Sequence, residues 1–304
     1  MASITPLDVN WVDHPHSIGA ALLESDGHRS LIDPGPTSTL DTLRERLREH
    51  GFSVADLDAI LLTHIHLDHG GASGSLVREN PSLPVYVHQN GAPHMADPSK
   101  LIASATRLWG DKLEYLFGEM VPVPQDNLRI LAGGETLEFG SRKLEVVYTP
   151  GHASHHVSYF DHHEGVAFVG DTTGVRIDNG PYILPATPPP DIDLTLWDKS
   201  FAEILARQPK RLFLTHYGFA ENPAAHIATF RERLYRWTDQ TEQILRAAAG
   251  DDAAALQQFL AFAHLDIANF LAPEEIEHYA FTAGLDLSFA GLARHIRKRA
   301  QKTA

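Results

Sequence analysis

A histidine-rich string at residues 61–71 holds the densest group of chemically active side chains in the sequence. Its letters are LLTHIHLDHGG, and four residues within it carry side chains that bind metals: His64, His66, Asp68 and His69. In extended backbone, residues two apart point the same way, so His64 and His66 can converge on one point. If the chain then turns into a helix, Asp68 and His69 project from its first turn toward the same place. Four such side chains exceed what one ion needs from one loop, so the string predicts two metal ions.

Three more metal-binding side chains follow short apolar runs farther along the chain. They are His152 in the string TPGH, Asp171 in VGDT and His216 in FLTHYG. Each has an ordinary structural interpretation when taken alone: His152 as a turn residue, Asp171 as a turn cap and His216 as a core histidine. Taken alone, the residues leave both the metal-binding and the structural interpretations open.

The composition limits the chemistry of that site. The chain has 304 residues, 19 histidines and no cysteine, so thiolate zinc sites, iron–sulfur clusters, disulfides and a cysteine nucleophile are excluded. Imidazole and carboxylate ligands suit Zn²⁺, Fe²⁺ or Mn²⁺. A net charge of −14 argues against a protein that binds nucleic acid by neutralising phosphates.

No segment of the sequence has the pattern of a signal peptide or a membrane span. The N-terminus lacks a basic start and an apolar run, and polar residues interrupt the most apolar window, residues 253–272. We therefore expect a cytoplasmic protein that acts on a small molecule, with neither nucleic acid nor membrane as a partner. A homodimer is a further expectation.

Hydrophobic patterns predict the elements that must position these side chains. Apolar runs typical of strands alternate with helical patterns over about two-thirds of the chain, and only helical patterns follow residue 224. We expect a catalytic domain at residues 1–222 and a helical region at 223–304 packed on it. The predicted strands are 18–24, 31–32, 58–63, 85–88, 128–131, 136–139, 144–148, 157–160, 166–169 and 212–215. The predicted helices before residue 224 are 39–50, 92–118 and 194–208.

The string HIHLDH resembles the HxHxDH motif of the metallo-β-lactamase-fold metallohydrolase superfamily, which includes lactonases, glyoxalase II-like enzymes and phosphotriesterase-like enzymes. His152, Asp171 and His216 occur in the order of that family's later ligands, and the match spans residues 18–218. The resemblance implies an α/β fold, an αββα sandwich of two mixed β-sheets flanked by helices, here with a C-terminal helical extension. Asp33, in the string LIDPG, matches an early turn in which the family's aspartate orients a ligand imidazole.

The resemblance also implies which residues bind which ion. One ion would be held by His64, His66 and His152, the other by Asp68, His69 and His216, with Asp171 as a bridge. Two divalent ions are expected, Zn²⁺ before iron or manganese. Such ions, about 3.5–4 Å apart, share a hydroxide and polarise the substrate.

These residues predict a hydrolase whose metal-bridging hydroxide attacks small, fairly apolar esters, lactones or phosphotriesters. Asp68 is expected to steer the hydroxide proton in addition to binding metal. Tyr217 is expected to donate a hydrogen bond to the developing oxyanion, the alternative being a packed aromatic ring. Two segments rich in apolar residues, 92–120 and 174–190, either wall a pocket over the metals or bury each other in the core.

Two other functions use overlapping sets of residues. A glyoxalase II-like thioesterase shares the ligand set and has a helical C-terminal region. A persulfide dioxygenase-like oxidoreductase needs one iron held by two histidines and one aspartate, which this sequence also supplies. Four further histidines fall outside the motif and are interpreted as lying behind the ligands or at the surface: His155, His156, His162 and His163.

Overall fold

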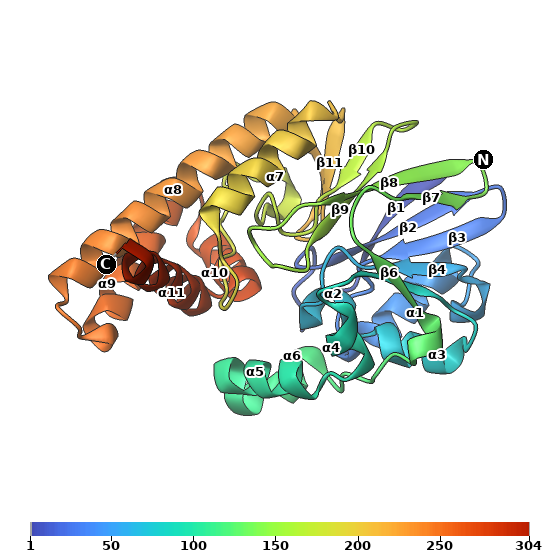
Figure 1. The fold of residues 1–304 in the computed structure, drawn as a ribbon, viewed down its shortest axis with the longest axis horizontal. Coiled ribbons are helices and arrows are strands. Elements are labelled where there is room, and N and C mark those ends of the chain that lie inside the picture. The colour runs from blue at the N-terminus through green and yellow to red at the C-terminus, as the bar shows by residue number, and fades with distance from the viewer. Residues whose placement is uncertain (1, 304) are drawn as a thin grey trace.

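Two six-stranded sheets lie face to face between layers of helices (Figure 1). The structure is a computed structural model and describes residues 2–303. The first sheet has the order β1 (Ser3–Asp8), β2 (Gly19–Ser25), β3 (His28–Ile32), β4 (Ala59–Leu61), β5 (Val85–His88) and β6 (Leu128–Leu131). The second has the order β12 (Gly218–Glu221), β11 (Arg211–Leu214), β10 (Val166–Phe168), β9 (Val157–Asp161), β8 (Arg142–Tyr148) and β7 (Thr136–Phe139).

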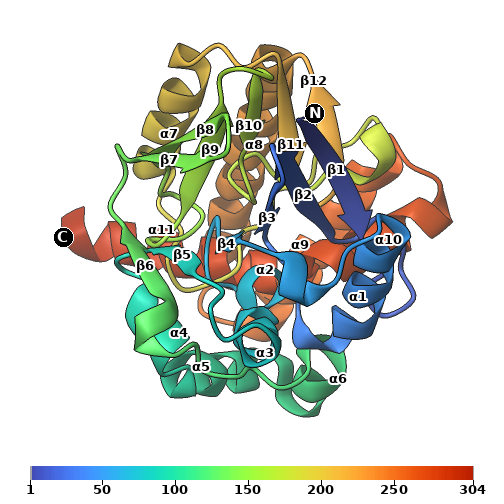
Figure 2. The same ribbon diagram turned by 90° about the vertical axis from the view of Figure 1, so that its right-hand side faces the viewer.

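Both sheets are mixed. Strands β3 to β6 run parallel to one another, as do β10 and β11, and the other neighbours are antiparallel. This arrangement confirms the αββα sandwich expected from the sequence. Figure 2 shows the sheets in the middle, with α7 and α8 on one side and α1 and α3 to α6 on the other.

The α-helices of the described chain are α1 (Leu40–Glu49), α2 (Leu67–Gly70), α3 (Ser73–Glu79), α4 (Ala92–Ala96), α5 (Ser99–Trp109), α6 (Leu113–Phe117), α7 (Leu194–Ala206), α8 (Pro223–Ala247), α9 (Asp252–Ala268), α10 (Pro273–Ala283) and α11 (Leu285–Thr303). The last four pack on one another and on the 174–190 segment. Their core joins Trp237, Phe259 and Leu292 to Tyr182 and Leu184 of that segment. Within residues 2–303, no helix combines the length and apolar character that crossing a bilayer requires.

Strand β2 shows why the sheets are covered on both faces. Successive residues of a strand point to opposite faces. Ala20 and Leu22 pack under the helices, whereas Ala21 and Leu23 pack between the two sheets. A strand buried on both faces is a continuous apolar run, which is why the sequence predicts it.

Three parts of the fold differ from the sequence prediction. The sequence pattern does not indicate strands β1 and β12, because both are edge strands with weak signals: β1 contains Pro6, which an edge tolerates, and β12 has only four residues. The helical pattern over residues 92–118 is divided into α4, α5 and α6. Pro98 and Gly110, the latter with a φ of 54°, lie at the two interruptions.

A buried ion pair joins Arg142 of β8 to Asp161 of β9 within the second sheet. Arg142 also donates to the carbonyls of Ser3 and Glu24 in the other sheet, at 3.0 and 3.3 Å. Arg142→Ala should lower the free energy of unfolding by about 3–5 kcal/mol, because the Asp161 carboxylate loses its buried counter-ion. Urea-induced unfolding measures this loss. The control Arg46→Ala removes an exposed ion pair and should cost less than about 1 kcal/mol; equal losses would contradict the prediction.

His226, on α8, makes the stability depend on pH. Its ring is buried, its Nε2 donates to the carbonyl of Thr173 at 3.0 Å, and its Nδ1 has no hydrogen-bond partner in the described chain. Burial lowers the pKa of His226 to about 4, whereas an unfolded chain gives about 6.5. Between about pH 4 and 6.5 the unfolded chain binds more protons than the folded chain. The contribution of His226 to the free energy of unfolding is therefore complete above about pH 6.5 and is lost as the pH falls toward 4.

The variant His226→Gln tests this pH dependence. It keeps a donor toward Thr173 but cannot titrate, so its stability should fall less steeply than that of the wild type between about pH 7 and 4. Thermal unfolding across this range measures both slopes. Identical slopes in the two proteins would show that His226 does not contribute.

Candidate metal centre

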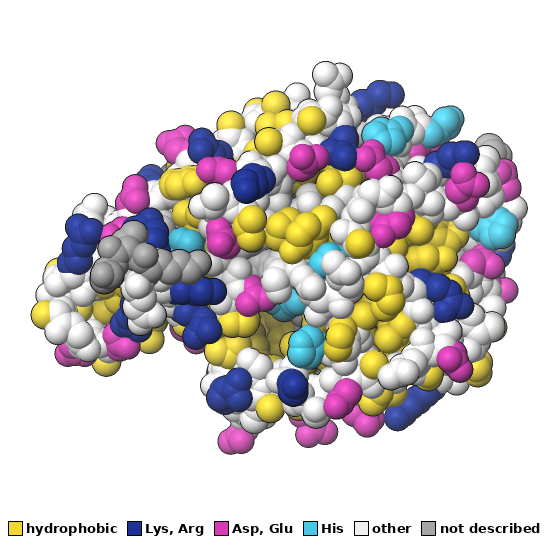
Figure 3. Space-filling model, viewed as in Figure 1, with side chains coloured by type: hydrophobic (Ala, Val, Ile, Leu, Met, Phe, Trp, Pro, Cys, Tyr) yellow, Lys and Arg dark blue, Asp and Glu magenta, His cyan; other side chains and the backbone are white. Residues whose placement is uncertain are grey.

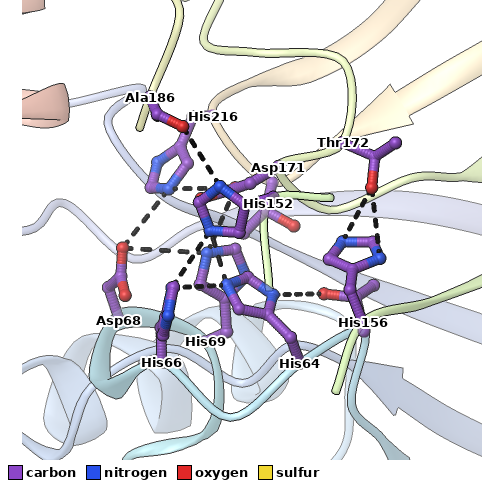
Figure 4. Close-up of polar contacts among 12 residues, drawn as sticks. His64, His66, Asp68, His69, His152, His156, Asp171, Thr172, Ala186 and His216 are labelled. Carbon is purple, nitrogen blue, oxygen red and sulfur yellow. Dashed lines mark hydrogen bonds and ion pairs between the residues drawn. The ribbon is translucent and has the colours of Figure 1, made fainter. Parts of the chain in front are cut away.

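The seven side chains predicted as metal ligands come together at one edge of the sandwich (Figure 4). They lie on the short helix α2 and on the segments that follow β4, β8, β10 and β11, so strands from both sheets deliver them to one place. Their ligand atoms form two sets, each within 4.8 Å: His64, His66, His152 and Asp171 in the first, and Asp68, His69 and His216 in the second.

The first set brings three imidazole nitrogens together. His66 Nδ1 lies 2.9 Å from His64 Nε2 and 3.1 Å from His152 Nε2. Asp171 Oδ2 lies 3.4 Å from His152 Nε2 and 4.0 Å from His64 Nε2. Three nitrogens and an oxygen therefore surround one point, which is an arrangement suited to a single divalent ion.

The second set is built around the other oxygen of the same aspartate. Asp171 Oδ1 lies 3.3 Å from His69 Nε2 and 3.5 Å from His216 Nε2. Asp68 Oδ2 lies 3.3 Å from His216 Nε2 and 3.7 Å from His69 Nε2. Asp171 thus presents one oxygen to each set, as a bridging ligand must.

Four of the imidazoles are fixed by a hydrogen bond at the nitrogen that faces away from the centre. The partners are Thr63 Oγ1 for His64 (3.1 Å), Asp33 Oδ2 for His69 (2.9 Å), the Ala186 carbonyl for His152 (3.1 Å) and the Ser17 carbonyl for His216 (2.6 Å). In each case Nδ1–H donates to an oxygen, so Nε2 faces the centre and, in the neutral ring, presents its lone pair there. This is the tautomer that a metal-binding histidine uses.

The donor atoms fit divalent cations. Without a cation, a single proton on His66 Nδ1 could bridge to only one of the two Nε2 atoms, those of His64 and His152, that lie about 3 Å from it. His69 Nε2 and Asp171 Oδ1 are buried and have no hydrogen-bond partner among the residues described. Buried polar atoms are nearly always satisfied, so these two orphaned atoms indicate a bound group. Nitrogen and carboxylate donors without sulfur suit Zn²⁺, Fe²⁺ or Mn²⁺.

The protonation states of the two sets differ. Burial lowers the pKa of His64 well below its usual value and that of His66 to about 4, so both rings are neutral near pH 7. Burial also disfavours the charged form of the two histidines in the second set. The Asp171 carboxylate stabilises that form, and the pKa values of His69 and His216 are raised. Despite its burial, Asp68 has a pKa of about 2 because His69 and His216 stabilise its charge.

Asp33 lies directly behind His69. It is fully buried, and its Oδ1 accepts the backbone N–H of Thr63 at 2.8 Å. Its Oδ2 accepts from the hydroxyls of Thr63 and Thr215 at 2.7 and 2.8 Å, in addition to the His69 ring. Asp33 therefore joins the ends of β3, β4 and β11 to one imidazole, in the position that the sequence predicts for it.

A cavity of about 300 Å³ opens over the two sets. His66, Asp68, Asp171 and His216 contribute to its lining, and most of its remaining wall is apolar. Figure 3 shows the surface hollowed between the parts labelled α5 and α10 in Figure 1, with hydrophobic side chains inside the hollow. A substrate in this cavity would therefore contact both the centre and an apolar wall.

The two apolar segments predicted at 92–120 and 174–190 divide between the cavity and the core. Leu101, Leu108 and Trp109 line the cavity from the first segment, and Val175, Ala186 and Pro188 to Pro190 line it from the second. In contrast, Met95 and Leu184 are buried in core clusters. The cavity-wall alternative therefore holds for part of each segment, and the remaining residues named here lie in two separate core clusters rather than against each other.

The structure does not bring Tyr217 to the cavity. Its ring stacks on His16, with centroids 4.6 Å apart, and packs so closely on Gly19 that a Cβ there would overlap it. Burial also raises the pKa of its hydroxyl. The packed aromatic ring, which the sequence left as the alternative, describes this residue, and we assign it no role in the reaction.

The four histidines outside the motif have different positions. His155 lines the cavity, and His156 is buried behind His64, where its Nδ1 contacts the hydroxyls of Thr149 and Thr172. His162 and His163 are largely exposed.

Sequence reasoning missed three functional contributions. The Ser17 and Ala186 carbonyls, which hold His216 and His152, belong to backbone and leave no mark in a sequence. Trp11, which lines the cavity, lies in an irregular loop between β1 and β2, far from any recognisable motif.

Comparison with curated proteins finds relatives over about half of the chain. It is 33% identical over 172 residues to the metallo-beta-lactamase fold-containing protein ST1585 of Sulfurisphaera tokodaii, an alignment that covers 55% of this chain and 63% of that protein. It is 30% identical over 151 residues to a hydroxyacylglutathione hydrolase of Aeromonas hydrophila, covering 50% of this chain and 44% of the relative. The chain thus spans less than two-thirds of the length of these relatives.

Solved structures share the fold. The metallo-beta-lactamase family protein TTHA1429 from Thermus thermophilus superposes with a TM-score of 0.70 at 21% identity, over 100% of this chain and 94% of that one. The protein TTHA1623, in a di-iron-bound form, gives 0.52 at 27% identity, over 70% of this chain and 93% of that one. The family model of the metallo-beta-lactamase superfamily matches residues 17–216, which include all seven side chains of the centre. The chain therefore belongs to the metallo-beta-lactamase superfamily.

Proposed function

We propose that the protein is a dinuclear metal-dependent hydrolase of small, fairly apolar esters, lactones or phosphotriesters. The observation that carries the proposal is the position of Asp171, which offers one oxygen to each of two donor sets on the floor of an apolar cavity. A site for two ions beneath an apolar wall suits hydrolysis of an uncharged ester bond.

The proposed ligands divide as the two sets do. His64, His66 and His152 would hold one ion, Asp68, His69 and His216 the other, and Asp171 would bridge them. We propose Zn²⁺ for both positions, with iron or manganese as alternatives. Bound ions of this kind polarise the scissile carbonyl or phosphoryl oxygen and make water acidic enough to attack near neutral pH.

The residues of the chain supply orientation and proton handling. Asp68 lines the cavity and its pKa of about 2 keeps it ionised, so its carboxylate can accept a hydrogen bond from the attacking water and steer the water proton. Leu101, Leu108 and Trp109 of α5 line the cavity, where they would bind the apolar part of a substrate.

Hydrolysis of a thioester is a second candidate. The Aeromonas hydrophila relative is named hydroxyacylglutathione hydrolase. In addition, Lys100 and His94 line the cavity of this chain, where they can contact a carboxylate on a thiol leaving group. The position of Asp171 between two sets favours two ions over the single iron of a persulfide dioxygenase.

We also propose that the catalytic domain ends at residue 222 and that the C-terminal helical region begins at residue 223. Strand β12 ends at Glu221 and α8 begins at Pro223, so the last strand and the first C-terminal helix are separated by one residue. The helical region still reaches the cavity, through Thr282, Ala283 and Leu287.

An activity panel tests the proposed function. The Zn²⁺-loaded protein should bind two ions per chain and hydrolyse an aryl ester, a lactone or a phosphotriester faster than a thioester or a phosphodiester. His69→Ala should reduce kcat/KM by more than about 100-fold, because losing a ligand exceeds the 10–100-fold effect typical of residues behind ligands. His163→Ala, at an exposed position, is the control.

Three outcomes contradict specific parts of the proposal. Unchanged metal content and hydrolysis in His69→Ala would exclude the dinuclear assignment. Preferred hydrolysis of the thioester would replace the proposed substrate with the second candidate. One iron per chain together with oxygen uptake on a persulfide would identify a dioxygenase.

Asp33→Asn tests the support behind the second set. The amide keeps the shape of the side chain, but it removes the charge and one of the oxygens that accept from His69 and two threonines. The affinity for metal should fall by about 10–100-fold. Competition with a chromophoric chelator measures it, and Asp41→Asn, at an exposed position on α1, is the matched control. Equal affinities in both variants would show that Asp33 does not orient a ligand.

A further inference from the structure

We infer that the C-terminal helices are part of the metal centre, because α10 and α11 fix the two backbone carbonyls that orient His216 and His152. This inference rests on the proposed function, since it concerns side chains assigned there to metal ions. It extends the site beyond residues 17–216, the part of the chain that matches the family model.

Four histidines of the centre are held in two different ways. His64 and His69 are held by Thr63 and Asp33, side chains that lie in or beside the first sheet. His152 and His216 instead donate to main-chain carbonyls of irregular segments. A carbonyl in an irregular segment is only as well placed as the contacts that hold the segment, so the position of these two rings depends on what packs against them.

Helix α11 holds the segment that orients His152. The hydroxyl of Thr187 donates to the Ser288 carbonyl at 3.1 Å, and the hydroxyl of Ser288 donates to the Pro185 carbonyl at 3.4 Å. One turn later, Gly291 packs so tightly that a Cβ would overlap the Thr187 carbonyl. The residues on both sides of Ala186 are therefore fastened to α11, and all of these contacts are buried.

Helix α10 holds the segment that orients His216. The Ser17 hydroxyl lies 2.9 Å from His278 Nε2 and 3.1 Å from Thr282 Oγ1, while the Ser17 carbonyl accepts from His216. The loop before Ser17 is strained, because Val12 is β-branched and has a φ of 52°. Such a conformation persists only where surrounding contacts impose it, and Phe281 of α10 packs on the rings of Trp11 and His14 in this loop, with centroids 4.9 and 4.0 Å apart.

Helix α10 also anchors the start of the segment that carries Ala186. The hydroxyl of Tyr279 contacts the backbone N–H of Ile177 at 2.9 Å and the Tyr182 carbonyl at 3.0 Å. Both ends of this segment thus attach to the C-terminal helices. The segment touches the second set as well, since the Arg176 N–H donates to the His216 carbonyl at 2.6 Å.

Two variants, each directed at one of the two carbonyls, test the inference on the metal-loaded protein. Gly291→Ala inserts a methyl group between α11 and Thr187, and Ser17→Ala removes the hydroxyl that α10 holds. Chelator competition with Zn²⁺ should show that each variant weakens one of the two metal affinities by about 10-fold and leaves the other unchanged. Thr187→Val exchanges only a hydroxyl for a methyl group and repeats the first test without adding bulk.

Double-mutant cycles assign each loss to its histidine. Gly291→Ala should change nothing further once His152 is replaced by alanine, and Ser17→Ala should change nothing further once His216 is replaced. A general loss of stability would lower metal binding in both backgrounds. Ala255→Gly, on α9 in the core that the C-terminal helices share, controls for such a loss and should leave both affinities unchanged.

The outcomes separate this inference from the proposed function. If the wild type binds no metal, both are wrong. If the wild type binds two ions, and Gly291→Ala, Thr187→Val and Ser17→Ala bind them equally well, the proposed function stands and the role of the C-terminal helices is excluded. The same exclusion follows if the losses persist without His152 or His216.

Discussion

The buried carboxylate of Asp171 is the constraint on which the rest of the structure depends. Its two oxygens face different groups of imidazoles, and Oδ1 has no hydrogen-bond partner within the described chain. Burying such a charge requires compensating positive charge close by. The sandwich meets this requirement by ending four strands from its two sheets at one edge, so that ligands separated by more than 150 residues in the sequence surround one carboxylate.

The convergence of the first four ligand candidates could be predicted from the sequence, because their spacing along the chain indicates which way their side chains point. His64 and His66 lie two apart after a buried strand, and Asp68 and His69 lie in the helix that follows. The three later ligand candidates have no local signal of that strength. Their positions came from the order of motifs in a known superfamily, and the structure brings all of them to the same edge.

What the sequence could not predict is how the rings are held. A side-chain support such as Asp33 occurs in a motif, but the carbonyls of Ser17 and Ala186 are chemically identical to every other carbonyl in the chain. Likewise, the hydrophobic character of Tyr217 does not reveal which neighbour its ring covers. The edge strands β1 and β12 were missed for a related reason, since half-exposed strands lack the continuous apolar run of a central strand.

The C-terminal helices connect substrate recognition to the metal centre. Thr282 of α10 lines the cavity and also contacts Ser17, while Leu287 of α11 lines the cavity beside Ser288. Under the proposed function, the contacts of Thr282 therefore bear on both substrate range and metal affinity, because the same side chain lines the cavity and contacts the residue whose carbonyl accepts from His216.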